Sequence, residues 1–312
     1  MKCIFYRCRR TLSALLLALA AMPLVAHADL NIFTTVPEWG ALVNALGGDK
    51  VKNFTATAPL QDPHHIQARP SLIGRARNAQ LVVATGAELE IGWLPVVLRD
   101  SGNPDIQENH PGLFEAARYV RLLDIPASVD RSMGDVHAQG NPHIQTDPRN
   151  LVPIARALAQ RMGELDPANR DYYDGRLQAF LTGWDVNLGR WAEQAKPLQG
   201  VRIWAQHDGF PYLNDWLGLK QVGTLEPRPG VDPSVAYLGE VLQRQKTLQG
   251  QMIITAAYQS DSASRWFSER TGLPVVVLPF TVGGTAQAGS LEALYDDTIA
   301  RLLAALAKGS KP

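Results

Sequence analysis

The sequence predicts an α/β protein made of two lobes, each a parallel sheet covered by helices. The first observation is that short β-branched segments alternate with helical stretches along the chain, which is the pattern of parallel sheets whose crossovers are helices. The second is that these segments fall into two sets of four, separated by the longest helical pattern in the sequence. No sequence repeat accompanies the two sets, so the predicted likeness between the lobes is architectural only.

Eight segments have the length and composition of buried strands. In the first half of the chain they are Leu30–Thr34, Val51–Thr57, Gln80–Ala84 and Tyr119–Leu123. In the second half they are Val201–Gln206, Lys220–Thr224, Met252–Thr255 and Val275–Leu278. We therefore predict an N-terminal lobe over residues 29–165, a linking helix over 166–197 and a C-terminal lobe over 198–312.

The linking helix is predicted from its ends and its apolar period. Asp166 suits an N-cap, Pro167 suits the first helical position, and Pro197 ends the pattern. Large apolar residues recur between them at steps of three or four: Tyr173, Leu177, Phe180, Trp184, Leu188 and Trp191. About 30 helical residues make a rod of roughly 45 Å, which can hold two lobes at a fixed distance. The alternative is an ordinary surface helix of a single domain.

The N-terminus has the three parts of a secretory signal peptide. A basic start precedes an apolar run from Leu12 to Val25, and Ala26-His27-Ala28 supplies the small residues of a cleavage site. We predict cleavage after Ala28 and export to the periplasm. The run has 14 residues, short of the roughly 20 that span a bilayer, so a retained membrane anchor is the weaker alternative.

Removing residues 1–28 changes the composition of the working protein. The full chain of 312 residues has 30 Lys and Arg against 30 Asp and Glu, whereas the remainder has 26 against 30, a net charge of −4. A mildly acidic protein without a basic stripe offers no field for nucleic acid. Both cysteines, Cys3 and Cys8, precede the cut, so the mature chain has no disulfide, no cysteine-rich zinc site and no lipid-carrying cysteine.

Three histidines occupy similar places after predicted strands. His64 lies in Asp62-Pro63-His64 after the second strand, His143 in Asn141-Pro142-His143 after the fourth, and His207 directly follows the fifth. Ligands of open α/β sheets collect at the carboxyl ends of strands, and three imidazoles with one oxygen complete a tetrahedral zinc shell. A single loop histidine is more often solvated or hydrogen-bonded. The repetition of the pattern is what favours a metal site.

These segments resemble the metal-specific substrate-binding proteins of ABC transporters, the ZnuA-type receptors for zinc and manganese. The similar segments, which run through nearly the whole mature chain, are Asp62-Pro63-His64 with Arg69-Pro70-Ser71, Asn141-Pro142-His143-Ile144 with Asp147-Pro148-Arg149-Asn150, Gln206-His207-Asp208-Gly209-Phe210 with Tyr212-Leu213, and the helix from Asp166 to Lys196. The resemblance implies two (β/α)4 lobes joined by a rigid helix, with a metal in the interlobe cleft held by His64, His143 and His207.

The resemblance also implies the function and the partners. We expect a non-enzymatic receptor that captures Zn(II) in the periplasm and delivers it to an ABC membrane permease. A periplasmic zinc metallochaperone is a further candidate partner, and we expect a monomer that binds no nucleic acid. Because a rigid helix joins the lobes, metal binding is expected to move the lobes little and the nearby loops more.

The fourth ligand stays open, because members of this family usually bring a carboxylate from the last lobe. This chain has no acid in Thr255-Ala256-Ala257-Tyr258-Gln259 or in Pro279-Phe280-Thr281-Val282-Gly283-Gly284-Thr285. Water or a loop acid such as Asp261 would fill the place. Asp261 precedes an apparent helix, so N-terminal capping is its alternative role.

Four other groups near these motifs have less defined roles. The segment from Arg131 to Gly140 contains Asp135 and His137, which would collect a metal before it reaches the cleft; an ordinary surface loop is the alternative. His65 is a candidate accessory group beside His64. His110 has no neighbour in the sequence that favours a function.

A nitrogen-rich ligand set favours Zn²⁺ over Mn²⁺, which prefers carboxylate oxygen. Copper(II) also binds imidazole, whereas the absence of mature cysteines and the presence of only five methionines argue against a Cu(I) carrier.

The rival class is an exported zinc hydrolase, but the sequence has no HExxH or GxSxG motif, and Asp208 is the one acid placed to act as a base. A manganese receptor of the same family and a structural surface protein are the remaining alternatives.

Overall fold

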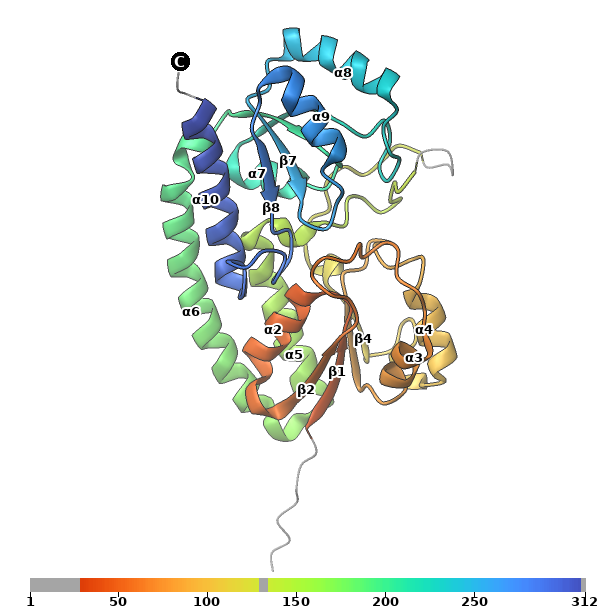
Figure 1. Cartoon of the computed structure of the whole chain (residues 1–312). Helices are drawn as coiled ribbons and strands as arrows, with labels where there is room; N and C mark the ends of the chain where they lie inside the picture. Colours follow the sequence, from red (N-terminus) through yellow and green to blue (C-terminus); the bar gives the residue numbers. More distant parts are fainter. Residues whose placement is uncertain (1–28, 129–133, 310–312) are drawn as a thin grey trace, which may run out of the picture.

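The computed structural model describes residues 29–128 and 134–309 and contains two four-stranded parallel sheets, one in each lobe (Figure 1). The first sheet has the order β2-β1-β3-β4 and the second the order β6-β5-β7-β8. The strands are β1 (Leu30–Thr34), β2 (Val51–Thr55), β3 (Leu81–Ala84), β4 (Leu113–Glu115), β5 (Arg202–Ala205), β6 (Lys220–Thr224), β7 (Met252–Ala256) and β8 (Val275–Leu278). The two lobes share one strand order, and the predicted fold class is confirmed.

Helices cover both faces of each sheet. They are α2 (Pro37–Gly47), α3 (Pro70–Arg77), α4 (Leu94–Ser101), α5 (Leu151–Leu165), α6 (Arg170–Gln194), α7 (Pro211–Leu217), α8 (Val235–Leu248), α9 (Ser262–Thr271) and α10 (Leu291–Gly309). In Figure 1, α6 runs along one side of the molecule past both lobes, with α10 beside it. The predicted signal peptide, residues 1–28, lies outside the described residues.

One predicted strand is wrong. The fourth strand is β4, which pairs with β3 through Val82↔Leu113 and Val83↔Phe114, whereas the predicted segment Tyr119–Leu123 is not a strand. Phe114 is buried in the core, while Val120 and the leucines after it pack against that core only partly buried. The apolar residues of the predicted segment therefore reflect packing at the edge of the core and not pairing in the sheet. The other seven strands match their predictions or differ by one or two residues at an end.

The long helix begins later than predicted. Asp166 ends α5 and starts a short 3-10 turn, Pro167–Asn169, so Asp166 is not the N-cap of the long helix. Its carboxylate instead accepts hydrogen bonds from Asn169 Nδ2 at 2.8 Å and Tyr173 Oη at 2.6 Å. The helix proper has 25 residues, which gives a rod of about 37 Å. It is shorter than predicted but still long enough to reach both lobes.

A continuous apolar core joins the lobes along this helix. Trp184 and Trp191 of α6 are buried and meet edge to face, with ring centroids 5.2 Å apart. Both indoles also contact Tyr295 of α10, at 5.6 and 5.1 Å, and Trp184 Nε1 donates to the carbonyl of Pro148 at 2.9 Å. The same cluster includes residues of both sheets, from Leu30 in β1 to Leu278 in β8. The separation of the two sheets is therefore set by core packing.

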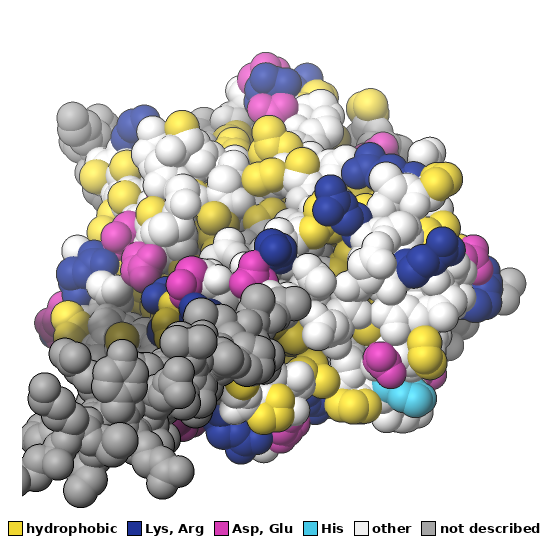
Figure 2. All heavy atoms as spheres, turned by 90° about the horizontal axis from the view of Figure 1, so that it is seen from below, with side chains coloured by type: hydrophobic (Ala, Val, Ile, Leu, Met, Phe, Trp, Pro, Cys, Tyr) yellow, Lys and Arg dark blue, Asp and Glu magenta, His cyan; other side chains and the backbone are white. Residues whose placement is uncertain are grey.

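The surface is mixed in charge. On the face shown in Figure 2, Lys and Arg side chains lie among Asp and Glu side chains and form no single basic field on the part that undescribed residues leave visible. Within the described ranges, no helix has both the length and the apolar character needed to cross a membrane.

Replacing Trp184 by alanine tests the helix anchor. Because the side chain is 1% exposed, its removal leaves a cavity and an unpaired carbonyl, and we expect the free energy of unfolding to fall by about 3–5 kcal/mol. Val186→Ala is the control, since Val186 lies on the same helix and is 69% exposed. Chemical denaturation measures both variants, and equal effects would contradict the assigned anchor.

Candidate metal centre

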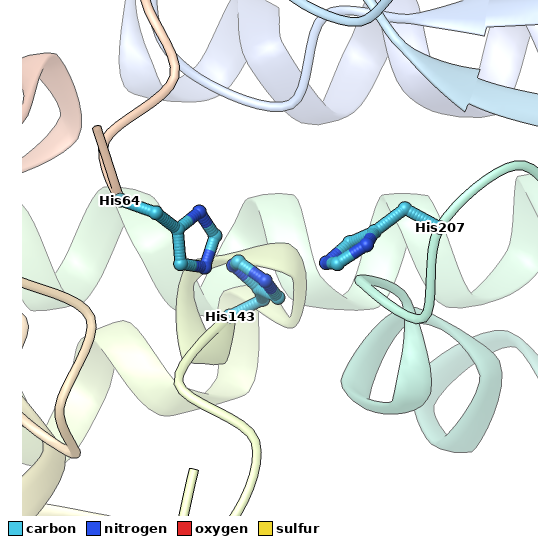
Figure 3. A group of neighbouring side chains, drawn as sticks. All are labelled: His64, His143 and His207. Carbon is cyan, nitrogen blue, oxygen red and sulfur yellow. The ribbon is translucent and has the colours of Figure 1, made fainter. Parts of the chain in front are cut away.

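Three histidines from separate segments converge between the lobes (Figure 3). His64 lies in the loop after β2, His143 precedes the 3-10 turn Ile144–Thr146, and His207 is the second residue after β5. Their exposed fractions are 8%, 1% and 5%. Each offers one ligand nitrogen, and these three atoms all lie within 4.8 Å of one another. The structure thus brings together the three histidines that the sequence singled out.

The geometry is close to what a small cation needs. Two nitrogens bound to one tetrahedral zinc lie about 3.4 Å apart, given bonds of about 2.0–2.1 Å, so movements of about 1 Å complete the arrangement. His64 Nε2 and His143 Nδ1 are buried and have no hydrogen-bond partner among the described residues. A buried polar atom without a partner is costly. A bound cation would satisfy such nitrogens.

Carboxylates orient two of the rings. His64 Nδ1 lies 2.8 Å from Asp62 Oδ1, and His207 Nδ1 lies 2.8 Å from Glu226 Oε2. Glu226 Oε2 also accepts the backbone N–H of Gly230 at 2.8 Å. Carboxylates that hold one imidazole nitrogen leave the other free for a metal and raise its basicity. Sequence reasoning missed Glu226, although an acid two residues after the sixth predicted strand was the available signal.

The two rings most affected by burial differ in their protonation. Burial lowers the pKa of His143 well below its ordinary range, and the nearby charges of His64 and His207 lower it further. Burial also opposes a charge on His207, but the hydrogen bond and negative charge of Glu226 outweigh burial and raise the pKa of His207. Burial therefore favours the neutral, metal-binding form of His143, whereas Glu226 favours protonation of His207, with which a metal would compete.

Asn141 fixes the His143 loop against the His207 loop. Its Oδ1 accepts the backbone N–H of His143 at 3.0 Å, and its Nδ2 donates to the carbonyl of Asp208 at 2.7 Å. Tyr212 Oη donates to the Asn141 carbonyl at 2.7 Å. The Asp208 carboxylate, which was the candidate base of a hydrolase, accepts a hydrogen bond from Gln221 Nε2 at 2.9 Å.

A fourth histidine lies beside this centre, although it is not one of the three whose ligand atoms lie within 4.8 Å of one another. The ring of His137 stacks on that of His64 with centroids 5.4 Å apart, and His137 Nε2 is buried without a hydrogen-bond partner among the described residues. Burial, followed by the charge of His64, lowers the pKa of His137 to about 4. His137 is therefore a neutral imidazole beside the three others. Of the predicted loop, residues 131–133 lie outside the described residues.

The segment that holds His137 contacts both lobes. Asp135 N donates to the carbonyl of Pro229 at 2.9 Å in the C-terminal lobe. Ala138 N donates to Glu88 Oε2 at 2.6 Å in the N-terminal lobe. Gly230 has φ +74°, and a Cβ there would lie 2.1 Å from Asp135 Oδ2, so glycine permits this close approach.

The remaining candidates lie at the edge of the centre or outside it. His65 is exposed, with its Nε2 3.5 Å from Asp135 Oδ2. Asp261 is not part of the histidine group, because its carboxylate pairs with Arg265 at 2.6 Å. Asp261 begins α9, but its side chain makes no capping hydrogen bond. His110 is exposed on the surface.

A buried acid lies behind the histidines. Glu38 is 3% exposed and accepts a hydrogen bond from Thr281 Oγ1 of the other lobe. Burial raises the pKa of Glu38 to about 7, and the Thr281 hydrogen bond opposes this only in part. Glu38, His143 and Gln145 line one cavity of about 20 Å³, which has room for one water molecule.

Glu38 makes the stability of the protein depend on pH. The folded chain holds this proton more tightly than the unfolded chain, so the free energy of unfolding falls as pH rises from about 4.5 to about 7. Glu38→Gln cannot ionise, and we expect it to be more stable than the parent above this range, by on the order of 3 kcal/mol. Below the range the difference should vanish. Thermal unfolding as a function of pH measures this, and a constant difference would contradict it.

Comparisons with known proteins give a consistent result. Residues 32–309 match the family described as ZnuA, zinc-uptake complex component A, periplasmic. The high-affinity zinc uptake protein ZnuA of Yersinia pestis is 22% identical over 288 residues, covering 86% of this chain and 84% of that protein. The manganese ABC transporter substrate-binding lipoprotein PsaA of Streptococcus pneumoniae is 19% identical over 261 residues, covering 81% and 80%.

Solved structures share the fold. A crystal structure of ZnuA superposes with a TM-score of 0.73 at 22% identity, covering 88% of this chain and 98% of that one. The substrate-binding protein FpvC of Pseudomonas aeruginosa, solved with Mn²⁺, gives 0.74 at 21% identity, covering 90% and 98%. The relatives thus include proteins named for zinc and proteins named or solved with manganese.

Proposed function

The chain belongs to this ZnuA family of substrate-binding components of metal ABC transporters, and from that premise we propose that it captures Zn(II) in the periplasm and delivers it to an ABC permease. The observation that carries the choice of zinc is the group of buried imidazoles at the interlobe centre, His64, His143 and His207. The proposal includes export by the predicted signal peptide, cleaved after Ala28, and action as a monomer without enzymatic turnover.

We assign the fourth coordination place to His137. Its Nε2 is buried beside the His64 ring and lacks a partner among the described residues. Asp62 and Glu226 already bind the ring nitrogens of His64 and His207. The other acids beside the centre are Asp124, Asp135 and Asp208, which line a pocket with His137, His143 and His207. The proposed donor set is four imidazole nitrogens around one ion, and three imidazoles with one of these acids or water is the alternative.

This donor set favours zinc. Zn²⁺ is commonly four-coordinate and binds imidazole well, whereas Mn²⁺ prefers carboxylate, carbonyl and water oxygens in a larger shell. Copper(II) also accepts imidazole but prefers a square or tetragonal arrangement, whereas zinc is commonly tetrahedral.

Capture and release involve the His137 segment more than the lobes. The lobes are joined by the core along α6, whereas residues 135–138 are tied by the two hydrogen bonds to Pro229 and Glu88. Movement of this segment would uncover the centre without separating the sheets. A permease that displaces it would gain access to the ion. A periplasmic metallochaperone would use the same route to load the protein.

Zinc titration of the purified mature chain tests the proposal. We expect tight binding of one zinc per chain, and loss of a factor of at least a hundred in affinity for each of His64→Ala, His143→Ala and His207→Ala, since each removes one nitrogen ligand. The exposed His110→Ala is the matched control. Binding that survives all three substitutions would refute the site, and hydrolysis of ester or amide substrates by the zinc form would support the hydrolase instead.

A second pair of variants tests the fourth ligand. We expect His137→Ala to weaken zinc binding by about ten- to a hundredfold, because water replaces a nitrogen in the shell. His65→Ala, which removes an exposed neighbouring histidine, should change the affinity by less than threefold. Competition against a zinc chelator measures both. Equal effects of the two substitutions would remove His137 from the proposed shell.

A further inference from the structure

Phe280 has an unusual backbone for an aromatic residue. It follows β8 with φ +66°, and the N–H of Thr281 donates to the carbonyl of Pro279 at 2.8 Å. This is the hydrogen-bond pattern of a γ-turn centred on Phe280, and positive φ gives the strained form of that turn. Such strain persists only where the surroundings impose it, and strained residues cluster at functional sites.

The surroundings of Phe280 hold its ring in one place. Phe280 is 7% exposed, and its ring centroid lies 5.5 Å from those of both Phe210 and Tyr258. The next residue, Thr281, is bound to Glu38 across the lobes. A side chain fixed by contacts on several sides keeps its shape when a ligand binds nearby.

The ring of Phe280 lies directly against the metal centre. Its centroid is 5.1 Å from that of His143, with the ring planes 65° apart. A Cβ on Gly209 would lie 3.2 Å from His207 Cδ2 and 3.4 Å from Phe280 Cε2, so Gly209 lies between Phe280 and the His207 ring. An aromatic side chain without a donor atom therefore contacts His143 directly and faces His207 across a glycine.

We propose that Phe280 is a specificity-determining residue, whose ring places a surface without ligand atoms on one side of the metal centre and narrows the space there to the cavity of about 20 Å³ that it lines with His143 and Glu38. The inference rests on the proposed function. This role gives a reason for an aromatic residue at a position where glycine would be unstrained. An ion that needs only four nitrogens fits this centre, whereas an ion that needs six ligands loses the places that water would fill.

The Phe280 ring affects zinc and manganese differently because the two ions prefer different ligands. Zn²⁺ has no geometric preference from its d electrons and loses little in a four-coordinate site. Mn²⁺ prefers six oxygen-rich ligands and gains nothing from an aromatic carbon surface. A ring that takes the place of oxygen ligands thus changes the ratio of zinc to manganese affinity more than the zinc affinity itself. Each tenfold change in that ratio corresponds to about 1.4 kcal/mol.

Three variants of the full mature chain separate this role of the ring from mere packing. Phe280→Gly removes the ring and also the backbone strain, so it should fold. Phe280→Asp adds a carboxylate in a residue that tolerates positive φ better than most. Phe280→Leu keeps an apolar side chain and is the control. Zinc and manganese affinities are measured by competition, and bound cobalt(II) is measured by visible absorption, which is intense in four-coordinate sites and weak in six-coordinate ones.

We expect Phe280→Gly and Phe280→Asp to lower the ratio of zinc to manganese affinity at least tenfold and to weaken the cobalt(II) bands, with the larger change in Phe280→Asp. Phe280→Leu should keep both the ratio and the bands. The inference is overturned if Phe280→Gly and Phe280→Asp bind zinc with an unchanged ratio, or if Phe280→Leu shifts the ratio as far as Phe280→Gly. A parent chain that binds no zinc would instead contradict the proposed function.

Discussion

The apolar core that runs along α6 sets the distance between the two sheets, and the positions of the histidines depend on it. Trp184 and Trp191 pack against Tyr295 of α10, so residues of both lobes form one cluster. His64 comes from one sheet and His207 from the other. Without a fixed separation, their ligand nitrogens would not lie within 4.8 Å of each other. This shared core is the basis for the proposal that metal binding moves the loops more than the lobes.

The metal centre balances burial against charge. Buried imidazoles lose their protons readily, as the low pKa of His143 shows, while the carboxylate of Glu226 keeps His207 basic. The carboxylates of Asp62 and Glu226 each hold one ring nitrogen, which leaves the other nitrogen of His64 and of His207 for an ion. The ring of Phe280 packs against His143 and adds a carbon surface that has no ligand atom. In the proposed function, selectivity for zinc over manganese depends on the absence of oxygen ligands on the Phe280 side as well as on the imidazole nitrogens.

The sequence predicts the fold and the three central histidines, and the features that it did not predict were missed for physical reasons. The fold class and seven strands follow from period and composition, and the three Pro-His and His-Asp motifs gave the central histidines. Tyr119–Leu123 failed as a strand because an apolar run at the edge of a core looks like a paired one. Glu226, Glu38 and Phe280 were missed because their roles depend on contacts between distant segments and on a backbone angle. The place of Glu226 after a strand was the one local signal among them.

Zinc K-edge X-ray absorption of the mature protein loaded with one zinc per chain tests the central claim most directly, because it reports the number and type of ligands in solution. The account predicts four nitrogen ligands at about 2.0–2.1 Å, with the multiple-scattering signal of imidazole rings. A shell of five or six mainly oxygen ligands, or one with fewer than three imidazoles, would contradict it.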